Sequence, residues 1–132
     1  MLQKMRVVIQ ACFQAVVHTS LNYENRMNWD VDFYDFKEFY RSPCKARRHL
    51  YYTLKFPASV SDRDFYLNEH TIADYPEPGM FTIFLESMVP NETEMPKHKN
   101  RVRVNLHGFG AVLKPFFDTM LNKEITEIFF VS

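Results

Sequence analysis

The sequence predicts a single α+β domain in which one helix precedes a run of antiparallel β-strands. Apolar side chains recur at helical spacing over residues 12–28, and after residue 31 apolar and polar side chains alternate in successive short runs. A chain of 132 residues can bury one core but not two. A sheet with this many strands must curl, and curled sheets wrap a helix or enclose a cavity. We therefore expect one curved sheet with one helix on its N-terminal side.

The N-terminal part of the chain contains the expected helix. Residues 6–10 are rich in β-branched side chains and predict a short first strand. Over residues 12–28, apolar side chains such as Val17 and Leu21 recur every three or four positions, while polar side chains fall mostly between them. This spacing predicts one amphipathic helix that ends at Trp29.

The centre of the chain predicts a hairpin of two strands, at residues 48–56 and 64–74. Pro57 cannot donate to a strand ladder, and Asp62 can bond its own backbone, so the chain is expected to turn between the two runs. Residues 31–40 are aromatic and partly alternating, which predicts another strand before this hairpin.

Three further strands are expected: one at residues 81–89, one from residue 102 up to Pro115, and one at residues 124–131. Gly108 and Gly110 continue the apolar face of the middle one without side chains, which indicates a bulge or a close approach of another group. Pro115 is expected to end that strand. Both faces of the last strand are apolar, so both are expected to be buried against other elements.

The most apolar face of each strand is expected to point into a common cavity. Strand side chains alternate between the two faces of a sheet, so the side chains of one face can be counted from the sequence. The predicted cavity lining consists of Leu50, Tyr52, Leu54, Phe65, Leu67, Glu69, Phe81, Ile83, Leu85, Val102, Val104 and Leu106.

Glu69 is the one carboxylate on this predicted face. A buried carboxylate without a partner is costly. Three interpretations stay open: Glu69 lies in water near a strand end, it pairs with a structural arginine, or it holds the polar end of a bound ligand.

Composition narrows the function classes. Lysine plus arginine and aspartate plus glutamate each number 16, so the chain lacks the basic surplus on which general nucleic-acid binding depends. Only three glycines occur, which disfavours glycine-rich phosphate loops. No apolar run approaches 18 residues, so no membrane-spanning helix is expected.

Motifs for catalysis or metal binding are absent from the sequence. The five histidines lack zinc-helix spacing, although neighbouring strands could bring His49, His70 and His107 together. Cys12 and Cys44 have no metal-ligand spacing and are expected to be free, buried thiols, with one disulfide as the alternative. No serine sits in a Gly-x-Ser-x-Gly turn. We expect no cofactor, no metal and no enzyme activity.

Two basic clusters could touch a membrane. One lies in a turn around Pro43, and the second spans the end of a polar loop at residues 90–101; their members are Lys45, Arg47 and Arg48, then Lys97, His98, Lys99, Arg101 and Arg103. Each Lys or Arg near an anionic membrane contributes roughly 1 kcal/mol of binding. Ordinary solvated loops are the alternative interpretation.

Three segments of the chain combine into a recognisable pattern. They are Leu21 to Asp30 with Arg26 and Trp29-Asp30, then Tyr51 to Phe65 with Pro57 before Arg63-Asp64-Phe65, and finally Met95-Pro96, Val102-Arg103 and Pro115. In this order they resemble the START family, the StAR-related lipid-transfer domains. The resemblance covers nearly the whole chain but only the middle of the family module. It implies a helix-grip (START/Bet v 1-like) fold, in which a curved antiparallel sheet and a C-terminal helix enclose a lipid-sized tunnel.

This resemblance implies non-catalytic binding or transfer of one lipid, a sterol or a phospholipid, in a cytoplasmic protein with transient peripheral contact to membranes. The family's loop beside the tunnel mouth matches residues 90–101. Some family members keep a charged side chain for the ligand at the strand position of Glu69, where arginine is frequent. The alternatives are a lipid-free structural or interaction domain derived from this module and, with less support, a small helix-grip enzyme.

The chain departs from the family pattern at both ends. The family has a helix and two strands before the position of Arg6 and a C-terminal lid helix after the position of Ser132. Without them we expect an open strand edge at residues 6–10 and an uncovered apolar face on the last strand. Such surfaces favour pairing with another chain, so a homo-oligomer is expected, and cover by flanking sequence in the natural protein is the alternative.

Overall fold

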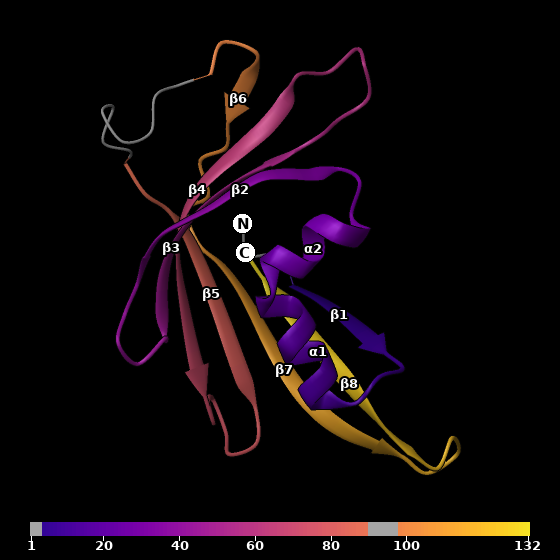
Figure 1. Ribbon diagram of the computed structural model, residues 1–132. Coiled ribbons are helices and arrows are strands. Elements are labelled where there is room, and N and C mark those ends of the chain that lie inside the picture. Colours follow the sequence, from indigo (N-terminus) through magenta and orange to yellow (C-terminus); the bar gives the residue numbers. More distant parts are fainter. Residues whose placement is uncertain (1–3, 90–97) are drawn as a thin grey trace.

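The computed structural model describes residues 4–89 and 98–132, which form two helices and one eight-stranded sheet (Figure 1). The elements are β1 (Lys4–Ile9), α1 (Phe13–Leu21), α2 (Tyr23–Trp29), β2 (Phe33–Arg41), β3 (Arg47–Leu54), β4 (Asp62–Ala73), β5 (Phe81–Ser87), β6 (Arg101–Arg103), β7 (Phe109–Asp118) and β8 (Lys123–Val131). The strand order is β1-β8-β7-β5-β4-β3-β2, and every neighbouring pair on this path is antiparallel. The predicted fold class is confirmed.

The predicted single helix is two helices. The backbone at Asn22 leaves helical geometry, with φ −92° and ψ 81°, and α2 begins directly after it. The Asn22 side chain accepts a hydrogen bond from the backbone N–H of Asn25 at 3.0 Å and so caps the first turn of α2. α1 packs on β7 and β8, whereas α2 packs on β2. The break therefore lets a short amphipathic segment cover two separate parts of the sheet.

The central hairpin, β3 and β4, brings the apolar side chains of its two strands to one face, as their alternation predicts. Leu50 pairs with Leu67 and Tyr52 with Phe65, which places these apolar side chains on one face. We call this the inner face, because both helices lie on it. Tyr23 of α2 joins Leu50, Tyr52 and Leu67 in one core cluster.

A second core cluster lies where α1 covers the other half of the sheet. Val16 of α1 packs with Ile83 of β5, Leu113 of β7 and Ile128 of β8. The predicted inner-face side chains of β5, Phe81, Ile83 and Leu85, belong to this cluster or pack against it, and so do Ile128 and Phe130 of β8. Phe129, Phe130 and Val131 at the end of β8 are half-buried.

The segment after residue 100 differs from the prediction. The strand expected from residue 102 up to Pro115 is interrupted, and its first part is only the three-residue β6, which pairs in parallel with the start of β4. β7 follows it and was not predicted as a separate strand. Gly108 has φ +143°, a conformation that favours glycine, where the chain bends from β6 towards β7.

Pro115 does not end its strand. β7 runs on to Asp118, and Pro115 lies opposite Thr126 of β8. β5 ends its pairing with β7 at Leu113, so in this part β7 has β8 as its only partner among the described residues. A proline is tolerated where one side of the strand pairs with no neighbour, because that side needs no backbone N–H donor.

Candidate functional site

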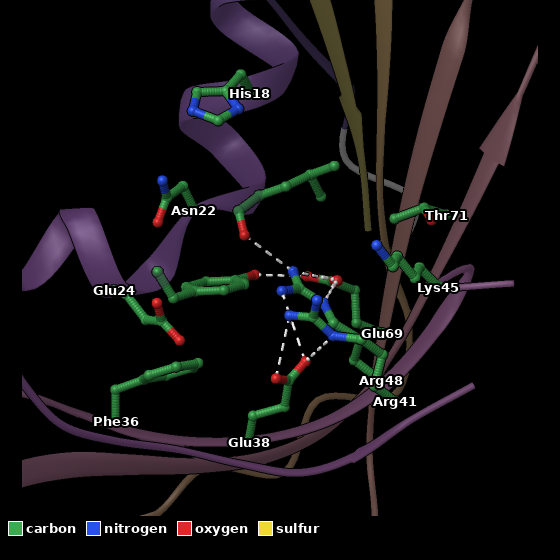
Figure 2. A pocket seen from close by; sticks show the side chains of 12 residues that line it. His18, Asn22, Glu24, Phe36, Glu38, Arg41, Lys45, Arg48, Glu69 and Thr71 are labelled. Carbon is green, nitrogen blue, oxygen red and sulfur yellow. Dashed lines mark hydrogen bonds and ion pairs between the residues drawn. The ribbon is translucent and has the colours of Figure 1, made fainter. Parts of the chain in front are cut away.

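A hollow of about 260 Å³ opens on the inner face, between the two helices and strands β2 to β4 (Figure 2). Most of its lining is polar or charged. The lining side chains are His18, Leu21, Asn22, Tyr23, Glu24, Phe36, Glu38, Arg41, Lys45, Arg48, Glu69 and Thr71. It is the candidate site because it brings ionic groups to the edge of the apolar core.

A buried ion pair forms the floor of the hollow. Arg48 of β3 lies directly across the ladder from Glu69 of β4, and an Arg48 Nη2 to Glu69 Oε1 distance of 2.6 Å joins them. The Glu69 side chain is 1% exposed. The Tyr23 hydroxyl donates to the second Glu69 oxygen at 2.7 Å. Both carboxylate oxygens are therefore engaged by the protein, which matches the structural-arginine interpretation of Glu69.

Arg48 also connects the floor of the hollow to α1 and β2. Its Nη2 donates to the Leu21 carbonyl oxygen at the end of α1, at 3.1 Å. Its Nη1 lies 3.9 Å from Glu38 Oε1 on β2. Glu38 in turn accepts two hydrogen bonds from Arg41, at 2.8 and 3.1 Å. One arginine thus links α1, β2 and β4 around the hollow.

Aromatic rings continue from the hollow into the core. The Tyr23 ring stacks on Phe36 at a centroid distance of 5.4 Å and on Phe33 and Tyr52 at 6.0 Å. Burial, together with the Glu69 charge, raises the pKa of Tyr23 well above its ordinary value. Burial also raises the pKa of Tyr52 to about 12. Both hydroxyls therefore stay neutral at physiological pH and can donate hydrogen bonds.

Two charged groups on the rim have no ion-pair partner among the described residues. Lys45 lies in the turn between β2 and β3, with φ 61°, and Glu24 lies in the first turn of α2. Figure 2 shows them on opposite sides of the paired charges. The hollow therefore offers a free ammonium group at one side and a free carboxylate at the other.

The predicted cavity residues divide into three groups. Leu50, Tyr52, Leu67 and Ile83 are buried in the core, and Glu69 forms the floor of the hollow. Leu54, Phe65, Phe81, Leu85 and Leu106 are half-buried and pack against the core clusters. Val102 in β6 is 47% exposed, and neither it nor Val104 packs against these clusters. Their predicted place on the cavity wall stays a prediction.

Most ionic residues of the hollow were not predicted as site residues. Arg48 could have been found, because it stands opposite Glu69 once the hairpin register is counted from Leu50 and Leu67. Tyr23, Glu24 and Glu38 could not, because the packing of α2 and β2 brings them to the site.

The predicted cysteine and histidine features are only partly present. Cys12 and Cys44 are free, as expected, but both are exposed instead of buried. His49 and His70 lie close together on the face opposite to the hollow, where burial, followed by the charges of Arg47 and His70, lowers the pKa of His49. In the ranges 4–89 and 98–132, no three His, Cys, Asp or Glu side chains are placed to hold a metal ion.

Comparison by sequence gives no match to a protein-family model and no close match to a curated protein. Comparison by structure gives clear matches. Human STARD10 superposes with a TM-score of 0.77 at 16% identity, over 98% of this chain and 49% of that chain. The human StarD13 (DLC2) lipid transfer and protein localization domain superposes with a TM-score of 0.75 at 22% identity, over 98% and 60%.

The chain has the fold of a START domain. A STAR-related lipid transfer protein fragment from Xanthomonas axonopodis also matches this START-like chain, with a TM-score of 0.66 at 15% identity, over 98% of this chain and 66% of that one. The chain thus spans from about half to two thirds of the length of these three structures. None of the helices in the described parts of the chain has the length and apolar character needed to cross a membrane.

Proposed function

We propose that this START-like chain binds one lipid on its inner face and carries it between membranes without catalysis. The observation that carries the proposal is the continuity of an ionic hollow with an apolar wall. Tyr23 and Phe36 line the hollow and also belong to the core cluster, which extends to the half-buried Phe65 and Leu106. A lipid is the class of ligand that has a polar end and a long apolar part. The lipid-transfer proteins that share this fold support this interpretation.

The apolar wall supplies the affinity in this proposal. Each CH₂ group removed from water contributes roughly 0.8 kcal/mol, so one acyl chain laid along the wall suffices for tight binding. The half-buried side chains Leu54, Phe65 and Leu85 are placed to contact such a chain, because they pack against the inner-face core cluster and are not fully covered by it.

We further propose that the lipid is a zwitterionic phospholipid and not a sterol. The hollow contains three cationic groups and three carboxylates: Arg41, Lys45 and Arg48, then Glu24, Glu38 and Glu69. A sterol has an uncharged hydroxyl group, which cannot match both the positive and the negative groups of the hollow. A headgroup with a phosphate and an ammonium can place the phosphate near Lys45 and the ammonium near Glu24. The Phe36 ring, which lines the same hollow, adds a face for the cation.

Uptake of fluorescent lipids from vesicles tests this proposal. Phosphatidylcholine should be taken up with one lipid per chain, and a fluorescent sterol should not. Lys45→Glu should weaken phosphatidylcholine binding about tenfold, or ~1.4 kcal/mol. Lys37→Glu is the matched control, because Lys37 is exposed on β2 and does not line the hollow.

The outcomes separate the alternatives. Uptake of the sterol alone would contradict the headgroup assignment but retain lipid binding. Uptake of neither lipid, with no lipid retained in native mass spectrometry of the purified protein, would favour a lipid-free interaction domain.

Peripheral membrane contact in the cytoplasm is part of the same proposal. Lys45 and Arg47 are exposed at the β2–β3 turn, so this first basic cluster is available to anionic headgroups. The second cluster is less available, because Arg101 and Arg103 pair with Asp35 and Asp64. Lys97 and most of the predicted loop at 90–101 lie outside the described residues.

A further inference from the structure

A second hollow, also of about 260 Å³, lies on the outer face of the sheet, away from the proposed lipid site. Asp64, His98, Arg101 and Arg103 line it. Asp64 alternates with Phe65 along β4, and Tyr51, which bonds Asp64, alternates with the inner-face Leu50 and Tyr52 along β3. The hollow is therefore separated from the lipid site by the sheet itself.

Arg103, which lines this hollow, has a guanidinium group whose orientation is fixed by Asp64 and one N–H donor without a partner among the described residues. Its Nε and Nη2 atoms donate to the two oxygens of Asp64, at 2.7 and 3.1 Å, in a fork geometry that sets the plane of the guanidinium group. Its Nη1 atom is buried and has no hydrogen-bond partner among the described residues. A buried donor without an acceptor is unfavourable, so an acceptor in the hollow would stabilise it.

Arg101 adds a second pre-oriented guanidinium group on the same face, two residues earlier in β6. Its Nη1 atom contacts Asp35, the Tyr51 hydroxyl and Thr53, at 2.6, 2.8 and 3.0 Å. Asp35 reaches it because an irregularity in β2 gives Asp35 a φ of 58°. No described residue bonds the Nε or Nη2 atoms of Arg101.

His98 supplies the third donor of the hollow. Its ring lies 6.2 Å from the Tyr51 ring, measured between centroids, and its side chain is otherwise exposed. Asp35 and Asp64 offset the charges of Arg101 and Arg103, so these four side chains together have no net charge. This hollow would therefore bind a ligand through N–H donors that no described residue bonds, and not through a surplus of positive charge.

We propose that the outer hollow binds a phosphate group through Arg103 Nη1, the N–H groups of Arg101 that no described residue bonds, and the His98 ring. Arginine forks match phosphate oxygens, and three donors from three residues suit a tetrahedral oxyanion better than a carboxylate with two oxygens. The hollow far exceeds the roughly 30 Å³ that one water molecule fills, so it has room for such a group. The phosphate can be free inorganic phosphate or the headgroup of an anionic lipid.

Titration with inorganic phosphate, followed by ³¹P NMR and by calorimetry, tests the proposal. Saturable binding is expected, and both Arg103→Lys and His98→Ala should weaken it about tenfold. Arg103→Lys keeps a positive charge beside Asp64 but loses the Nη1 donor. Arg47→Lys is the matched control, because Arg47 lies on β3, is exposed on the same outer face of the sheet and does not line the hollow. His98→Ala keeps the test valid if Arg103→Lys impairs folding, because His98 is exposed.

A second arm identifies the source of the phosphate. Recruitment to vesicles containing phosphatidic acid, but not to phosphatidylcholine vesicles, that is lost with His98→Ala would assign the hollow to a lipid headgroup. Phosphate binding without such recruitment would assign it to the free ion. The proposal is overturned if no saturable binding occurs in either arm, or if both variants bind phosphate as well as the parent does. These readouts do not depend on lipid uptake at the inner face.

Discussion

Glu69 shows how a charged residue is accommodated inside this sheet. Its carboxylate is 1% exposed, yet both of its oxygens have partners, Arg48 on the neighbouring strand and Tyr23 on α2. A buried charge that is paired and hydrogen-bonded avoids most of the cost of leaving water. The same contacts hold α2 against the sheet, so Glu69 links the site to the stability of the fold.

Glu69→Gln should therefore destabilise the protein strongly. Removing one partner of a buried ion pair leaves the other charge uncompensated, which costs about 3 kcal/mol of unfolding free energy. Tyr23→Phe is the matched comparison, because it removes one hydrogen bond to the same carboxylate and should cost about 1 kcal/mol. Urea unfolding at neutral pH measures both. Equal stability of Glu69→Gln and the parent would show that the pair contributes nothing to folding.

At the scale of elements, the short helices depend on a cap and on packing more than on their own length. α1 has nine residues and α2 has seven, and isolated helices of this length are marginal in water. Asn22 ends one helix and caps the next, and this turn positions Tyr23 over Glu69. The location of the candidate site therefore depends on one residue at the junction.

Asn22→Ala tests the role of this junction. Loss of the side-chain cap should lower the unfolding free energy by about 1 kcal/mol. Asn22→Asp keeps an oxygen acceptor for the Asn25 N–H and should stay close to the parent. Thermal unfolding monitored by far-ultraviolet circular dichroism compares the three proteins. An alanine variant as stable as the parent would indicate that packing alone holds α2 in place.

The hairpin of β7 and β8 is another element whose environment changes along its length. Away from the turn, β7 also pairs with β5, and β8 also pairs with β1. On the turn side of Leu113 and Thr126, the two strands pair only with each other among the described residues. Phe117 and Met120 near its tip are 57% and 95% exposed. The same strand can thus hold a core residue such as Leu113 and, four residues later, a largely exposed aromatic side chain.

At the scale of the whole molecule, the sheet has two open edges over the described residues, β1 and β2. Met5 and Val8 on β1 are 58% and 45% exposed. Open edges with apolar side chains favour pairing with another strand, so self-association through β1 is expected. This retains the homo-oligomer predicted from the sequence.

Val8→Lys should reduce that association. A lysine on an edge strand opposes edge-to-edge pairing, and at position 8 it would lie opposite Glu127, which the fold can tolerate. Light scattering across a dilution series should give a larger mass for the parent than for the variant at the same concentration. Val60→Lys is the control, because Val60 is exposed in the β3–β4 loop away from the edge. A parent that is monomeric at every concentration would contradict the expectation.

The sequence by itself determined the fold class, the bounds of most strands to within a few residues, and the shared face of Leu50, Tyr52 and Leu67. Alternation with period two is a local property, and it is visible wherever one face of a strand is buried. The resemblance to START domains, carried by three spaced segments, anticipated the matching solved structures. In the same way, the apolar side chains of α1 were visible as a helical stripe.

Only the tertiary structure decided which ionic residues meet. Arg48 and Glu69 are 21 positions apart, Arg103 and Asp64 are 39 apart, and Tyr23 reaches Glu69 from a helix. The break at Asn22 and the exposure of Val102 were equally invisible, because each depends on which remote elements pack nearby. Side-chain patterns report how one segment meets a core, whereas a site depends on the relative placement of several segments.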